Sequence, residues 1–254
     1  MNRLEKGLVL LATAATLAVN GLANTGALGG VTTGEVAARY SLPFTPAGYV
    51  FAIWGLIYLG LIAFSLFQAA GSASLRLAGL RPVYVFSAVA NVAWLWFWHH
   101  QALVASLVVM LMLLVSLAVA RRTLGAAPPG TRAEFWCVDA PFRLYLAWIS
   151  IATLANLAVV IVYAGTGAGP GAANGVSLAM LAAATGIAGF AYRSLRDPIF
   201  LVVIAWATLG IALRHGQPLW VSGPAMLVAA LAGLGAIGIL LEEARDLGRQ
   251  STSR

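Results

Sequence analysis

Long apolar runs are the feature that most constrains this chain. A helix needs about 20 mostly apolar residues to cross the roughly 30 Å hydrocarbon core of a bilayer. Eight candidate runs follow one another along the 254 residues. They are residues 8–27, 47–69, 82–98, 102–120, 138–163, 175–192, 198–213 and 223–241. The seventh run is short, and we expect Pro198 to begin its helix and Arg214 to snorkel toward water at its far end.

Composition supports a membrane-embedded, all-α chain. Only 9% of the residues are charged and 61% are hydrophobic, whereas soluble domains carry about 25% charged residues. The runs are rich in Gly and Ala and lack the apolar–polar alternation of an outer-membrane barrel. The sequence therefore predicts an all-α, polytopic integral membrane protein with eight transmembrane helices.

The basic residues give this topology an orientation. With the N-terminus placed inside, twelve basic residues fall inside, two fall outside, and Arg143 lies within the fifth run. The outside pair is Arg39 and Arg214, and the inside set is Arg3, Lys6, Arg76, Arg81, Arg121, Arg122, Arg132, Arg193, Arg196, Arg245, Arg249 and Arg254. This asymmetry predicts a protein of the inner cell membrane with both termini in the cytoplasm. The net charge of +7 is scattered between the runs, so we expect no nucleic-acid partner.

The chain divides by composition into four parts. Residues 1–163 form a five-helix unit that holds most of the Trp and Asn, and residues 164–174 form a Gly-rich outside loop. Residues 175–241 form three further, Ala/Gly-rich helices, and residues 242–254 form a cytoplasmic tail. Residues 1–27 also resemble a signal peptide. Asn20 and Asn24, four apart on one helical face, favour a retained helix, and we include both among the candidate ligand-binding residues.

Polar and aromatic side chains recur at helical spacing in three of the runs. They are Trp54 and Tyr58 in the second, Asn91 and Trp94 in the third, and Tyr145, Trp148 and Asn156 in the fifth. Residues three or four apart share one face of a helix. The three stripes can converge on a flat-walled cavity in which amide and indole N–H groups orient a largely apolar guest.

Simpler interpretations exist for single residues. An Asn inside a span is often a hydrogen-bonding link between helices, and Tyr49 and Trp98 are predicted to lie in the aromatic belt at the membrane surface. Asp139 and Arg143 are one turn apart and are expected to form an ion pair within their helix. We attribute His99 and His100 to a tight turn at the water interface rather than to a metal site.

Motifs for ordinary catalysis are missing from the sequence. We find no phosphate-binding glycine loop, no nucleophile–base pair and no zinc-spaced His/Cys set. Cys137 is the only cysteine, which excludes an intramolecular disulfide. We therefore expect no enzyme activity, no metal and no covalently bound cofactor.

The aromatic stripes resemble those of the TspO/translocator-protein family, the tryptophan-rich sensory proteins. Three motifs carry the resemblance over residues 1–163. They are Thr45 and Pro46 before Phe51, Trp54 and Tyr58; Asn91, Trp94 and Phe97; and Tyr145, Trp148, Ser150, Ala152 and Asn156. The chain departs from the family where Leu144 replaces a proline, where Phe51 and Trp54 stand one residue closer, and where no basic residue follows Tyr163. The three further helices indicate an elongated subfamily.

The resemblance implies a five-helix bundle around a pocket for flat hydrophobic ligands, with porphyrins or other tetrapyrroles among them. The loop of residues 28–46 would cap this pocket, and Arg39 would meet a porphyrin carboxylate. The implied function is a membrane-embedded sensor, regulator or carrier whose partners are an apolar small molecule and the lipid bilayer. Porphyrin breakdown, suspected for some family members, finds no catalytic residues in this sequence.

Two alternatives stay open. The chain could be a secondary transporter in which Asp139 and Arg143 form a coupling pair. The last three helices could cover one flank of the five-helix unit, or they could form a self-association surface that makes a homodimer.

Overall fold

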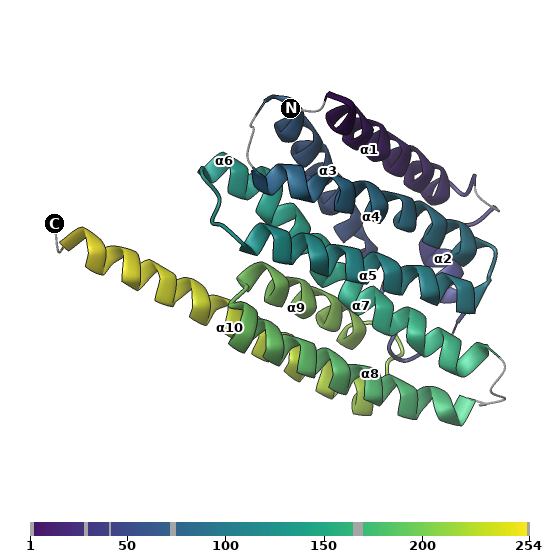
Figure 1. Cartoon of the computed structure of the whole chain (residues 1–254). Helices are drawn as coiled ribbons and strands as arrows, with labels where there is room; N and C mark the ends of the chain where they lie inside the picture. Colours follow the sequence, from purple (N-terminus) through teal and green to yellow (C-terminus); the bar gives the residue numbers. More distant parts are fainter. Residues whose placement is uncertain (1–2, 28–29, 41, 72–74, 165–169, 253–254) are drawn as a thin grey trace.

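The computed structural model describes residues 3–27, 30–40, 42–71, 75–164 and 170–252, and all regular elements within these ranges are helical (Figure 1). Within these ranges, seven helical segments are long and apolar enough to cross a membrane. Their principal helices are α1 (Arg3–Asn24), α3 (Ile53–Ala69), α4 (Leu75–His99), α5 (Leu103–Gly125), α7 (Ala140–Tyr163), α8 (Pro170–Phe190) and α10 (Leu219–Thr252). The prediction of an all-α, polytopic integral membrane protein is confirmed.

The predicted count of eight spans depends on α9 (Pro198–Ala212). Its 15 residues reach about 22 Å at 1.5 Å per residue, which is less than the hydrocarbon core. Its start is the predicted one, because Pro198 occupies the first turn and the Asp197 carboxylate accepts the Phe200 N–H at 3.2 Å. Seven spans therefore meet the length requirement among the described residues, and α9 is an apolar helix too short to meet it alone.

Short elements occupy the two ends of the bundle. At one end, α2 (Thr33–Ala38) and the 3-10 helix η1 (Gly48–Ala52) connect α1 to α3. At the other end, α6 (Arg132–Glu134) and the π-helical turn η2 (Phe135–Asp139) lead into α7. A second π-helical turn, η3 (Ala191–Leu195), leads from α8 toward α9.

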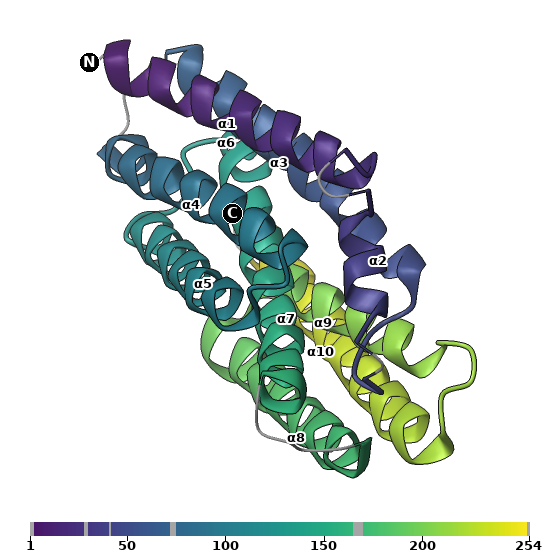
Figure 2. The ribbon, with the colours of Figure 1, turned by 90° about the vertical axis from the view of Figure 1, so that its right-hand side faces the viewer.

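Helix α7 is the central helix of the molecule. It packs against α3, α5, α8 and α9, and it is the span with the largest buried fraction (Figures 1 and 2). Helix α1 lies at the far edge, where it contacts α3 and α4. Since α7 packs against four other helices, most of its polar and apolar side chains are positioned by packing.

The last three helices cover one flank of the earlier ones. Helix α9 packs between α7 and α10, and α8 packs on α7 (Figure 2). Glycine permits one close approach, because a Cβ added at Gly210 of α9 would lie 2.0 Å from the Val50 side chain of η1. This arrangement agrees with the flank-covering alternative, while self-association stays a prediction.

Buried charges at the α6 end correct one expectation from the sequence. Arg76 of α4 donates to Glu134 at 2.6 Å and to Asp139 at 2.7 Å. Arg143 instead faces Asp197, with 3.7 Å between the Arg143 Nε and an Asp197 carboxylate oxygen. The predicted pair between Asp139 and Arg143 is therefore wrong, because partners from other helices reach both groups.

Candidate functional site

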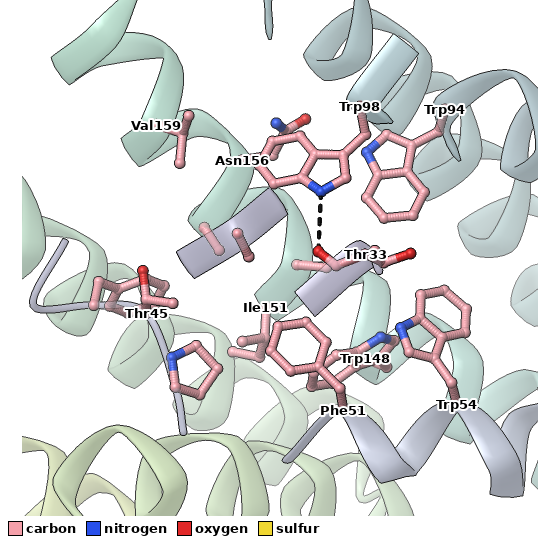
Figure 3. Close-up of a pocket in the computed structure, with 15 residues that line it drawn as sticks. Thr33, Thr45, Phe51, Trp54, Trp94, Trp98, Trp148, Ile151, Asn156 and Val159 are labelled. Atoms are coloured by element: carbon pink, nitrogen blue, oxygen red, sulfur yellow. Dashed lines mark hydrogen bonds between the residues drawn. The ribbon is translucent and has the colours of Figure 1, made fainter. Parts of the chain in front are cut away.

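A narrow apolar cavity lies between α2, η1, α3, α4 and α7 (Figure 3). Four of its 15 lining residues are tryptophans, namely Trp54 of α3, Trp94 and Trp98 of α4, and Trp148 of α7. Its volume is about 60 Å³, counted as the space open to the centre of a water molecule. The cavity can therefore hold a few water-sized groups as it stands, and a larger guest requires its walls to move apart.

Three of the indoles form one stacked wall. The ring centroids of Trp54 and Trp94 are 6.3 Å apart at 23°, and those of Trp94 and Trp98 are 6.1 Å apart at 19°. Trp148 meets Trp54 edge-on at 6.2 Å and 85°. Trp94 and Trp98 stack because residues i and i+4 lie on one face of α4, and Trp54 joins them from α3. The result is an aromatic wall of three indoles, with the fourth indole, Trp148, edge-on against it.

Two indole N–H groups at this cavity have no hydrogen-bond partner. The Nε1 atoms of Trp94 and Trp148 are buried and unpaired within the described part of the chain. Trp98 differs, because its Nε1 donates to the Thr33 carbonyl oxygen at 3.4 Å (Figure 3). A buried donor without an acceptor costs about 1–3 kcal/mol. A guest that carries acceptor atoms would remove this cost.

Several predicted site residues lie behind the indoles rather than in the cavity wall. Asn20 donates to Asn91 at 2.8 Å and accepts from the Tyr58 hydroxyl at 2.7 Å. Tyr145 interacts with the Asn91 side chain, and its ring lies 6.0 Å from that of Trp54. These residues join α1, α3, α4 and α7, as expected of interhelical hydrogen bonding.

The remaining predicted site residues lie either in the wall of the cavity or at the exposed surface of the protein. Trp54, Trp94, Trp148 and Asn156 line the cavity, where Asn156 also exchanges hydrogen bonds with Ser106 at 3.1 Å and 3.3 Å. Asn24 and Arg39 are exposed and do not line it.

Trp98 is a cavity residue that the sequence interpretation assigned elsewhere. It is 5% exposed, so its assignment to the membrane-surface belt is wrong, whereas Tyr49 is 48% exposed. Its position four residues after Trp94 was the available signal.

A cover closes one end of the cavity. The cover consists of α2 and of residues 42–47. We call residues 42–47 the strap. Thr33 and Ala37 of α2 and Thr45 and Pro46 of the strap all line the cavity. The Thr33 hydroxyl also lies 3.2 Å from the His99 Nε2, which ties α2 to the end of α4.

The C-terminal helices hold the strap in place. Arg214, directly after α9, donates to the carbonyl oxygens of Leu42 at 2.8 Å and Thr45 at 3.0 Å. The Ala47 N–H donates to the Gly210 carbonyl at 3.0 Å. Arg214 was expected to snorkel toward water, and this expectation is wrong because the bare strap carbonyls offer it closer acceptors.

Two further contacts come from other parts of the same helices. The Phe44 N–H donates to the Ser177 hydroxyl of α8 at 3.2 Å, and the Trp206 indole of α9 donates to the Val50 carbonyl at 3.1 Å. The helices that the sequence left without a role therefore position the cover of the cavity.

Comparison with protein families extends the sequence resemblance along the chain. The family model described as TSPO-like protein matches residues 6–241. No curated protein and no solved structure matches the chain. The matched region continues through α8 and α9 and into α10, so it includes the helices that hold the strap. The chain is an integral membrane protein that belongs to the TSPO-like protein family.

Proposed function

We propose that the chain binds a flat, largely apolar ligand of the tetrapyrrole kind in the tryptophan-walled cavity, and that it acts as a sensor, regulator or carrier of that ligand. Membership of the TSPO-like family supports a membrane-embedded binding or transport protein. The proposal that the ligand is flat rests on the stacked wall of Trp54, Trp94 and Trp98, which offers a π-face to a planar ring.

The polar groups of the cavity suit a ligand with acceptor atoms. The unpaired N–H groups of Trp94 and Trp148 can donate to a carboxylate or carbonyl oxygen of the guest. The rest of the lining is mainly aromatic or aliphatic. Such a wall with few polar groups is typical of small-molecule sites, in which the polar groups fix orientation.

The size of the cavity indicates how a large ligand would be admitted. Small-molecule pockets usually span about 300–1,000 Å³, whereas this cavity has about 60 Å³. The strap is held by hydrogen bonds from Arg214 to its carbonyl oxygens and from its own Ala47 N–H to the Gly210 carbonyl oxygen, and it belongs to no helix. It can therefore lift without breaking a helix, and we propose that its opening widens the cavity for the ligand.

We propose binding rather than catalysis. The lining residues that the structure describes include no ionisable side chain; Thr33, Thr45, Asn156 and the indole N–H groups supply the polarity of the cavity. Groups of this kind orient a guest, but they are weak as general acids or bases near neutral pH. The ligand would be held without a covalent bond.

The transporter alternative receives less support from the charged residues. Asp139, the candidate coupling acid, is held by Arg76 at 2.7 Å and does not line the cavity. A static buried pair of this kind is a structural element unless it can exchange partners. Proton-dependent uptake that Asp139→Asn abolishes would favour transport.

Fluorescence titration with protoporphyrin IX tests the proposal. Ligand bound beside the indoles will quench intrinsic fluorescence of the purified full chain. Trp54→Phe, Trp94→Phe and Trp148→Phe each remove stacking area or a donor, so each should weaken affinity by roughly 5- to 10-fold, about 1–1.4 kcal/mol. Trp136→Phe is the matched control, because Trp136 is 66% exposed and does not line the cavity.

The porphyrin affinities of these variants show whether the porphyrin binds in the cavity or elsewhere on the protein. Unchanged affinity in all three cavity variants, or an equal loss in Trp136→Phe, would place the porphyrin outside the cavity and defeat the proposal.

A further inference from the structure

Two grooves meet on the surface between α5 and η3, away from the tryptophan-walled cavity. The first, of about 400 Å³, is the more polar of the two and is lined by Arg121, Arg122, Ser194 and the smaller or apolar residues Gly125, Ala126 and Leu195. The second, of about 380 Å³, is mainly apolar and runs between α5, α7, α8 and α9. They share Arg121, Arg122 and Leu195, so they form one continuous depression with a basic end and an apolar end.

The basic end carries more positive than negative charge. Asp197 is fully buried and faces two arginines, with 3.5 Å to the Arg121 Nη2 and 3.7 Å to the Arg143 Nε. One carboxylate cannot neutralise two guanidinium groups. Among the other acids on this side, Glu134 and Asp139 are engaged by Arg76, and Glu242 is engaged by Arg196.

Buried side-chain atoms without a hydrogen-bond partner are also present at this end of the depression. Within the described ranges, the Arg121 Nε and the Arg143 Nε are buried without a hydrogen-bond partner, and the single Asp197 Oδ2 that faces both arginines is also without one. Arg122 is exposed at the lip of the same depression. A buried charge without full compensation is costly, and an anion that enters the groove would supply what the protein lacks.

The apolar end is shaped for a hydrocarbon chain. Ala118 of α5, Leu154 of α7 and Phe190 of α8 contribute to its lining, together with other aliphatic side chains. The small Ala118 side chain leaves space between the longer neighbours. A ligand that filled the whole depression would therefore need an anionic head and an apolar tail on the same molecule.

We propose that this depression is a binding site for an anionic phospholipid. Its phosphate would lie against Arg121 and Arg122, and one acyl chain would follow the apolar groove between α5 and α8. Basic pockets between transmembrane helices on the cytoplasmic side bind such head groups. The loop arginines place this end of the bundle on that side. A free phosphate would leave the apolar groove unfilled, so the lipid accounts for both halves.

The site is separate from the proposed ligand cavity. The two share no lining residue. Lipid binding here does not depend on what the tryptophans bind, and porphyrin titration therefore serves as an independent readout of correct folding.

Retention of lipid by the detergent-purified full chain tests the proposal. Native mass spectrometry would compare phosphatidylglycerol with phosphatidylcholine of the same acyl chains, and a separate titration would use inorganic phosphate. We expect preferential retention of phosphatidylglycerol. Arg122→Gln should weaken it by about fivefold, the contribution of one basic residue near the membrane surface. Ala118→Phe should block the apolar groove and reduce retention of phosphatidylglycerol.

Arg132→Gln is the matched control. Arg132 is exposed and belongs to the same set of inside arginines, but it lines neither groove. Arg122 is also exposed, so Arg122→Gln should keep the unfolding temperature of the parent. Equal retention of the two lipids would overturn the proposal. So would an equal loss in Arg132→Gln, retention unchanged in both Arg122→Gln and Ala118→Phe, or inorganic phosphate bound as tightly as phosphatidylglycerol.

Discussion

The side-chain amide of Asn20 in α1 donates to the side-chain oxygen of Asn91 in α4, and the two atoms are 2.8 Å apart. The same Asn20 side chain accepts from the Tyr58 hydroxyl of α3 at 2.7 Å. One residue therefore links three helices directly behind the stacked indoles. Since lipid offers no competing hydrogen bonds, such contacts fix how the helices sit against one another.

Removal of Asn20 should loosen this junction. Asn20→Ala deletes two interhelical hydrogen bonds and leaves the buried Asn91 and Tyr58 without that partner, so we expect a loss of about 1–2 kcal/mol in unfolding free energy. Denaturant unfolding in detergent measures it. Asn24→Ala is the matched control, because Asn24 lies one turn further on the same helix and is exposed. An equal loss in both variants would mean that the junction is not what stabilises α1.

Much of the fold could be predicted from local pattern. The apolar runs identified the long helices, since a span must be apolar along its length whatever it packs against. The three stripes that contain Trp54, Trp94, and Trp148 with Asn156 were predicted because residues three or four apart share one face of a helix. These predictions concern one helix at a time and need no knowledge of its neighbours.

Two of the errors concern residues whose partners lie far away in the sequence. Asp139 was paired with Arg143 because they are one turn apart, while its partner Arg76 stands 63 positions earlier. Arg214 was expected to reach water, yet it binds carbonyls of the strap about 170 positions earlier. A pattern of residues three or four positions apart cannot indicate contacts over such sequence separations. Such contacts can be identified only from the packed structure.

A methyl group at Gly210 should push α9 away from the strap region. Its Cβ would lie 2.0 Å from the Val50 Cγ2, a distance at which something must shift. Gly210→Ala should therefore lower stability by about 1–3 kcal/mol, as overpacking generally does. The midpoint of thermal unfolding in detergent measures the loss.

Gly233→Ala provides the comparison for Gly210→Ala. Gly233 lies within α10, and a Cβ there meets nothing within 4 Å. Helix propensity favours alanine by up to about 1 kcal/mol, so this variant should be neutral or slightly stabilising. Unfolding midpoints that agreed between the two variants would contradict the close contact between α9 and η1.

Helix α2 of the cover should lose stability at acid pH, because Glu35 then becomes protonated. Its carboxylate accepts the Thr32 backbone N–H at 2.6 Å, and this hydrogen bond lowers the pKa of Glu35 below its ordinary value of 4.5. A lowered pKa in the folded state means that the stabilisation is complete above pH 4.5 and is lost as the pH falls through the folded value. Helix α2 should therefore loosen below about pH 4.5.

Amide hydrogen exchange within α2 reports this transition. Protection should fall at acid pH in the parent protein after correction for the intrinsic exchange rate. Glu35→Gln cannot lose a charge, so its protection should be lower near neutral pH and nearly independent of pH over the same interval. An identical acid profile in both proteins would show that another group controls α2.

Arg214 should control how fast a ligand reaches the cavity. Arg214→Ala removes the donors to the Leu42 and Thr45 carbonyls. A net loss of about 1–2 kcal/mol from the closed strap raises its open fraction by roughly 5- to 30-fold. If binding requires opening, the association rate of protoporphyrin IX rises by the same factor, because the apparent rate scales with the population able to bind.

Stopped-flow fluorescence quenching measures this rate, and His215→Ala is the matched control, since the exposed His215 belongs to the same turn. An association rate unchanged in Arg214→Ala, or raised equally in His215→Ala, would show that the strap does not limit access and that the ligand reaches the indoles between the helices.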